Sequence, residues 1–132
     1  MRILLLAGLF IACDDHEFTG GHENTEPVSG SGYSAVQDIF ANSCTGCHAE
    51  NSTPPVLDGD LCTDIVGVDS SIDMAQIEVG DADNSYLLHK INNTHLDVGG
   101  GGGQMPIGGA LSPDEVTILT DWINDGAECG EE

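Results

Sequence analysis

The segment Cys44-Thr45-Gly46-Cys47-His48 holds the residues of this sequence that are best suited to chemistry. Two cysteines three positions apart lie on one turn of the chain, so both thiols can reach the two vinyl groups of a single porphyrin. The histidine that follows can then bind the iron from one side. The spacing predicts one covalently attached c-type haem, with thioether bonds at Cys44 and Cys47 and with His48 as the proximal iron ligand.

Two other uses of such a cysteine pair are weighed against haem attachment. A thioredoxin-like redox pair follows a buried strand in a βαβ unit, and the sequence predicts no such strand before Cys44. A zinc site needs a second pair of cysteines or histidines at close spacing, whereas Cys62 and Cys129 stand singly and far apart. A non-haem thiol or zinc lipoprotein is therefore the least favoured hypothesis.

Two amphipathic helices are expected to position the motif. Val36, Ile39 and Phe40 fall at i, i+3 and i+4, which predicts a short helix running directly into Cys44. A second helix is predicted to begin at Pro113, because Ser112 fits an N-cap, Pro113 the first helical position and Glu115 the capping-box position. This helix is expected to end near residue 126.

Four segments of the chain, in this order, resemble a class I c-type cytochrome domain of the planctomycete and myxobacterial type: 39–48, 80–91, 103–109 and the helix through 121–123. The resemblance spans residues 34 to about 129. It implies an all-α cytochrome c fold, in which short helices and long Gly-rich loops wrap around one covalently attached haem. It also implies that the C-terminal helix crosses the helix before the haem motif, so that Ile39 or Phe40 meets Leu119 or Trp122.

The second iron ligand of the resembled family is a loop methionine, commonly followed by proline, and Met105-Pro106 matches this pattern. A thioether raises the reduction potential of haem iron relative to a second histidine. His89, in a predicted helix, and His95, in a loop, are the rival ligands. The five glycines at 99–103 predict a flexible approach to Met105. A haem-based ligand sensor or a five-coordinate haem catalyst is the alternative function if Met105 is not a ligand.

The charge balance restricts the partners. The chain has 23 Asp+Glu and 2 Lys+Arg, a formal net charge of -21, and this excludes ordinary nucleic-acid binding, which needs a basic face. Redox partner proteins with a basic docking face suit such a surface. The sequence contains no recognisable nucleophile triad or catalytic carboxylate pair, so we predict that the protein is not an enzyme. The oligomeric state is not predicted.

The N-terminal residues predict an export signal. Residues 1–12 have the short apolar core of a signal peptide, and the stretch before Cys13 resembles a bacterial lipobox, whose cysteine receives lipid. An ordinary secretory signal is the alternative. Residues 13–33 are expected to form a flexible acidic tether, and residues 34–132 the monohaem cytochrome c domain. We expect an exported protein, periplasmic or in the cell envelope, that contacts a bacterial membrane only through its lipid anchor.

Two cysteines are not used by haem or lipid. In an oxidising compartment Cys62 and Cys129 most simply form a disulfide with each other, and two unpaired thiols are the alternative. Taken together, the sequence predicts a lipid-anchored electron-transfer protein that carries one electron at a time, with His48 and Met105 as axial ligands.

Overall fold

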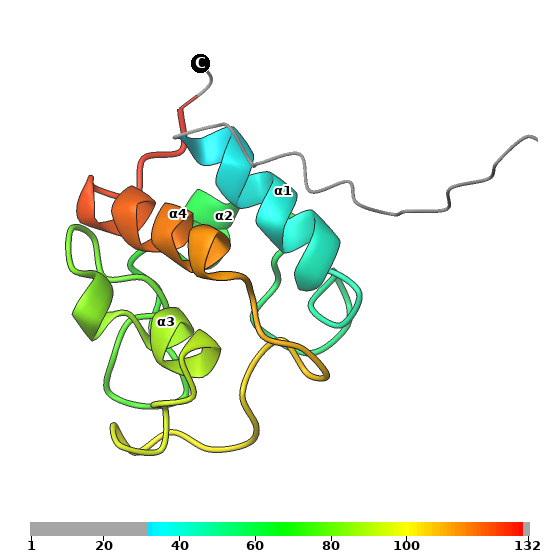
Figure 1. Ribbon diagram of the computed structural model, residues 1–132, viewed down its shortest axis with the longest axis vertical. Helices are drawn as coiled ribbons and strands as arrows, with labels where there is room; N and C mark the ends of the chain where they lie inside the picture. Colours follow the sequence, from blue (N-terminus) through cyan, green and yellow to red (C-terminus); the bar gives the residue numbers. More distant parts are fainter. Residues whose placement is uncertain (1–31, 131–132) are drawn as a thin grey trace, which may run out of the picture.

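The computed structural model of the protein describes residues 32–130. In this range the chain forms five short helical elements and no strand: α1 (Tyr33–Ser43), α2 (Leu61–Asp64), the 3-10 helix η1 (Ala82–Asn84), α3 (Tyr86–Ile91) and α4 (Pro113–Asn124). Long irregular segments connect them (Figure 1). The predicted signal peptide, the predicted lipid-attachment residue Cys13 and all but the last two residues of the predicted tether lie outside the described residues.

Helix α1 buries the face that the sequence pattern predicts. Val36, Ile39 and Phe40 are almost completely buried, at 1% exposure or less. The helix begins at Tyr33, one residue before the predicted start of the domain. At its other end the amides of Cys44 and Thr45 both donate to the Phe40 carbonyl, at 2.8 and 3.1 Å. The first cysteine of the motif is therefore held at the end of a helix that is itself anchored in the core.

Helix α4 has the predicted start. The Ser112 hydroxyl accepts from the Glu115 amide and the Glu115 carboxylate accepts from the Ser112 amide, which confirms the capping box. Helices α1 and α4 pack against each other, as Figure 1 shows. Tyr33 stacks on Trp122 with 6.2 Å between ring centroids. The four residues that were expected to meet between the two helices all belong to one hydrophobic cluster: Ile39, Phe40, Leu119 and Trp122.

A disulfide ties the segment after α4 to α2. It joins Cys62, in α2, to Cys129, after α4, with 6.0 Å between their Cα atoms. The indole nitrogen of Trp122 donates to the Glu128 carbonyl at 2.9 Å, which holds the same C-terminal segment against α4. The chain end is thus tied to the core both covalently and by a hydrogen bond.

Helix α3 is positioned by backbone contacts with the segment before it. The amides of Tyr86 and Leu87 donate to the carbonyls of Ala75 and Gln76, each at 3.0 Å. Just ahead of α3, the amide of Ala82 donates to the side-chain oxygen of Asn124 at 3.0 Å, which connects η1 to the end of α4. None of the helices within residues 32–130 is long and apolar enough to cross a membrane.

Candidate functional site

A cavity of about 510 Å³ lies between the haem-type motif, α3 and the loop that carries Met105. This volume falls in the range of roughly 300–1,000 Å³ that is usual for cofactor and small-molecule sites. Most of its wall is apolar, and the apolar side chains in the lining are Phe40, Pro54, Pro55, Leu57, Leu87, Ile91, Met105, Pro106, Ile107 and Leu111. The cavity is thus suited to a large, mainly hydrophobic group.

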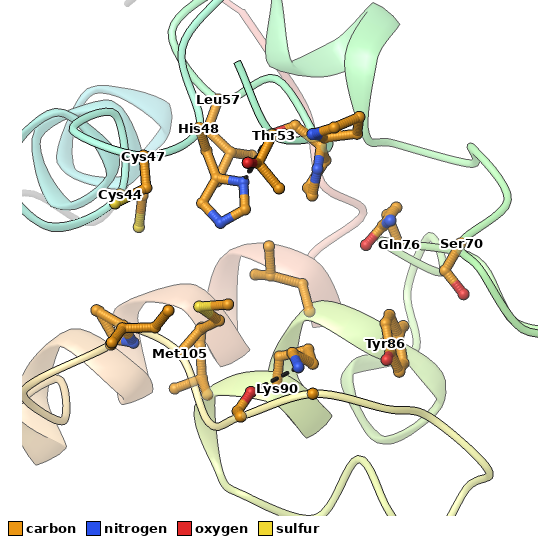
Figure 2. Close-up of a pocket in the computed structure, with 18 of the residues that line it drawn as sticks. Cys44, Cys47, His48, Thr53, Leu57, Ser70, Gln76, Tyr86, Lys90 and Met105 are labelled. Atoms are coloured by element: carbon orange, nitrogen blue, oxygen red, sulfur yellow. Dashed lines mark hydrogen bonds between the residues drawn. The ribbon is translucent and has the colours of Figure 1, made fainter.

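The four residues that the sequence assigns to a haem line this one cavity. Figure 2 shows the imidazole of His48 on one side of the cavity and the thioether of Met105 on the opposite side. Cys44 and Cys47 lie next to each other at the edge beside His48. The fold therefore brings together two segments that are more than fifty residues apart in the sequence.

His48 is held with one ring nitrogen free. Its Nδ1 is within hydrogen-bond distance of two backbone carbonyls, those of Thr53 at 2.9 Å and Pro55 at 3.1 Å. Carbonyl oxygens only accept, so Nδ1 must carry the proton, and Nε2 of the neutral ring has a free lone pair. The Leu57 amide donates to the His48 carbonyl at 2.7 Å and holds the backbone of the same loop. Nε2 points into the cavity in Figure 2, as a metal ligand would.

The two motif cysteines differ in environment, and neither forms a disulfide. Cys44 is half-buried and Cys47 is exposed. Burial, with a smaller contribution from the negative charge of Glu115, raises the pKa of the Cys44 thiol to about 11. Redox-active cysteine pairs depend on a lowered thiol pKa, because the thiolate is the nucleophile. The environment of Cys44 is thus the opposite of that in a thioredoxin-like site.

The glycines before Met105 serve the geometry of the loop. Gly99 and Gly102 have φ angles of +85° and +78°, which L side chains rarely adopt. A Cβ atom on Gly100 would lie 2.7 Å from Cε2 of Tyr86 and 2.8 Å from the His95 carbonyl oxygen. Glycine composition predicts flexibility, but at these positions the structure uses glycine for backbone conformation and close approach.

Hydrogen bonds attach this loop to the end of α3. The Met105 amide donates to the Lys90 carbonyl at 3.0 Å, and the Gln104 side chain donates to the Ile91 carbonyl at 2.7 Å. The Lys90 ammonium donates to the carbonyls of Gly101 and Gly103. Met105 is therefore presented from a segment that is held at several points.

The rival histidines lie outside the lining of the cavity. Both ring nitrogens of His89 have partners, the Thr94 hydroxyl at 2.8 Å and the Asp83 carbonyl at 3.0 Å, so His89 joins α3 to η1. His95 is 1% exposed, and its Nε2 donates to the Gly102 carbonyl at 2.9 Å. Its Nδ1 is buried without a partner among the described residues. His89 thus lies within α3 and His95 in the loop after it, and the nitrogens with partners hold these segments to their neighbours.

Polar lining residues that sequence patterns did not reveal lie at the other end of the cavity from the cysteines. Figure 2 shows Ser70, Gln76 and Tyr86 there, with Lys90 between Tyr86 and Met105. Ser70 and Gln76 belong to an irregular segment with no periodic pattern, so nothing in the sequence marks them. Lys90 does carry a signal, since it is the one Lys or Arg in residues 32–130.

Two further findings concern the identity of the site. Among residues 32–130, no group of three or more His, Cys, Asp and Glu side chains is arranged to hold a metal ion. Comparison of the chain with models of known protein families, with curated proteins and with solved structures found no match.

Proposed function

We propose that this protein is a one-electron carrier with a single covalently attached c-type haem, held between His48 and Met105. The proposal is carried by one observation: both cysteines of the Cys-x-x-Cys-His motif, its histidine and Met105 all line the same apolar cavity. Local spacing explains why the first three are together, but it does not explain Met105. We propose accordingly that residues 34–132 form a class I cytochrome c domain, which the α1–α4 contact and the order of the motifs support.

The donors around the cavity fit a haem of this type. Cys44 and Cys47 would each add an S–H across one vinyl group, so that sulfur and hydrogen end on adjacent carbons and no oxidant is needed. His48 would bind through Nε2, while its Nδ1–H bonds to the carbonyls of Thr53 and Pro55 fix the ring and strengthen it as a donor. Met105 would bind through its thioether. When bound, haem supplies an iron that changes its oxidation state by one electron.

The surroundings of the cavity suit electron transfer without substrate chemistry. Leu57, Leu87 and Ile91 are each 5–7% exposed and exclude water from the wall. A low-polarity wall and a thioether ligand both favour the less charged, reduced iron. With both His48 and Met105 bound to the iron, no coordination position would be left for oxygen or peroxide. We therefore place electron transfer ahead of catalysis and propose that the protein is not an enzyme.

The alternatives have less support. A haem-based ligand sensor or five-coordinate catalyst needs Met105 away from the iron, whereas the Met105 loop is hydrogen-bonded to α3. A zinc clamp needs a larger set of donors than the described residues bring together. A thiol redox pair needs a lowered thiol pKa, and that of Cys44 is raised.

The partner is proposed to be a redox protein with a basic docking face. Acidic side chains are spread over the exposed surface of the described residues, and Lys90 is engaged with the glycine loop. Encounter would then be steered by charge, as in other small and transient electron-transfer complexes. Association should slow as ionic strength rises, and a rate independent of salt would remove this part of the proposal. The sequence before residue 32 supports export and anchoring at Cys13 to a bacterial membrane. The net charge of -21 supports a partner other than nucleic acid.

The decisive experiment is an optical spectrum of the exported protein, produced in a host with working cytochrome c maturation. We expect sharp c-type bands in the reduced state, a weak sulfur-to-iron band in the ferric state and no change on addition of carbon monoxide. Bands that shift with carbon monoxide would favour the sensor or catalyst. A colourless protein would refute the haem proposal.

A further inference from the structure

We propose that Lys90 is the positioning residue for the Met105 ligand, and that it thereby decides whether the second axial position of the iron is closed. This inference rests on the proposed function, because it concerns a ligand of that haem. It deepens the function by naming the group that separates an electron carrier from a ligand-binding haem protein.

The first observation is the position of the ammonium group. Lys90 Nζ donates to the Gly101 carbonyl at 2.9 Å and to the Gly103 carbonyl at 2.6 Å. It also lines the cavity, and Figure 2 shows it beside Met105, on the side toward Tyr86. In a chain with this excess of acidic residues, the one basic side chain of residues 32–130 is directed to the backbone of the Met105 loop.

The second observation is that Lys90 holds the loop from two sides. Its own carbonyl accepts from the Met105 amide at 3.0 Å, so its side chain and main chain together bracket residues 101–105. Two neighbours hold the same stretch: Gln104 donates to the Ile91 carbonyl at 2.7 Å, and His95 donates to the Gly102 carbonyl at 2.9 Å. Of these side-chain contacts, only those of Lys90 reach two residues of the loop.

The third observation is that the two residues held by the ammonium group have no side chains of their own to order them. Residues 101 and 103 are exposed glycines, which have no side chain to pack and have the largest backbone freedom to lose. A charged donor makes stronger hydrogen bonds to carbonyls than a neutral one does. Without the ammonium group, the Met105 segment would be held only by the bond from the Met105 amide to the Lys90 carbonyl and by the bonds of Gln104 and His95. The loop would then spend more time away from the iron.

The test uses the full-length exported holoprotein and the variant Lys90→Met, whose unbranched side chain is one atom shorter and has no donor. We expect hydrogen exchange at the Met105 amide to become roughly tenfold faster or more. The reason is that loss of one hydrogen bond from a charged donor shifts the equilibrium between the closed and open loop by about tenfold or more. The ferric sulfur-to-iron band should weaken, and the reduced variant should bind carbon monoxide. Lys90→Arg, whose guanidinium retains charge and several donors, should restore all three properties.

The matched control is Gln37→Glu. It lowers the net charge by one, as Lys90→Met does, but it lies on the exposed face of α1. We expect it to leave amide exchange, the ferric band and carbon monoxide binding unchanged. An effect of Gln37→Glu equal to that of Lys90→Met would show that net charge, and not the clamp, is responsible, and would overturn the inference.

The two proposals fail in different ways. Wild-type protein without haem bands refutes the proposed function. Wild-type protein with haem and the sulfur band, but with a Lys90→Met variant that matches it in all three measurements, refutes the role of Lys90 alone. If Lys90→Met does not accumulate, Lys90→Gln gives the same decision, because its shorter amide cannot span both carbonyls.

Discussion

Removal of the Cys62–Cys129 disulfide should strongly lower the free energy of unfolding. The bond joins residues 67 positions apart and so closes most of the described chain into a loop. For a loop of this length, the chain-entropy relation gives a loss of about 15 cal/mol/K in the unfolded state, equivalent to about 4 kcal/mol at room temperature. Small domains are typically stable by only about 5–15 kcal/mol, so the loss is a large fraction of the total.

The change to make is the double substitution Cys62→Ala with Cys129→Ala, which leaves no unpaired thiol behind. The Trp122 hydrogen bond to the Glu128 carbonyl does not depend on the sulfurs, so the C-terminal segment keeps a folded-state contact. The expected result is therefore a decrease of about 4 kcal/mol in the free energy of unfolding, mainly through the unfolded chain.

The assay is guanidinium unfolding followed by fluorescence of Trp122, the one tryptophan of the chain. Parent protein should first be shown by mass to lack free thiols at these two positions. After reduction, the parent should unfold at the same denaturant concentration as the double variant, which serves as the control. A decrease below about 1 kcal/mol in the variant would refute the loop-entropy reasoning for this bond.

Three further predictions concern the site. Met105→Ala should lower the reduction potential and allow carbon monoxide to bind the reduced protein, and a variant unchanged in both measurements would show that Met105 is not the distal ligand. Gly100→Ala should lower the free energy of unfolding by roughly 1–3 kcal/mol in thermal or denaturant melts, because the added methyl group overlaps the ring of Tyr86 and the His95 carbonyl. A melt as stable as the parent would contradict that close approach. In apoprotein at pH 8, Cys44 should react with iodoacetamide much more slowly than exposed Cys47, since a pKa of about 11 leaves roughly one thiolate in a thousand. Equal rates, measured by peptide mass spectrometry, would mean that Cys44 is not buried as described.

The helices that bound the site could be predicted from sequence because their signals are local. The spacing of Val36, Ile39 and Phe40 defines a buried helical face, and the face is buried as predicted. The capping box at Ser112 depends only on residues within one turn, and it forms as predicted. Likewise, the chemistry of the Cys-x-x-Cys-His motif is contained in five consecutive residues.

The loop that presents Met105 could not be predicted in the same way. Its glycines suggest flexibility, but their role depends on what lies nearby, such as Tyr86 beside Gly100. The clamp by Lys90 depends on how α3 is placed against the loop, and that placement follows from backbone bonds to the segment at 75–76. No residue pattern encodes these contacts directly.

The sequence by itself determined the haem-type motif, the two flanking helices, the acidic surface and the prediction of an exported electron carrier. Only the tertiary structure decided that Met105 lines the same cavity as His48, that His48 has its Nε2 free, and that Cys62 lies beside Cys129. The physical reason is distance along the chain. Short-range patterns report hydrogen bonds and faces within one or two turns, whereas a cavity is built by the packing of segments that are distant in sequence.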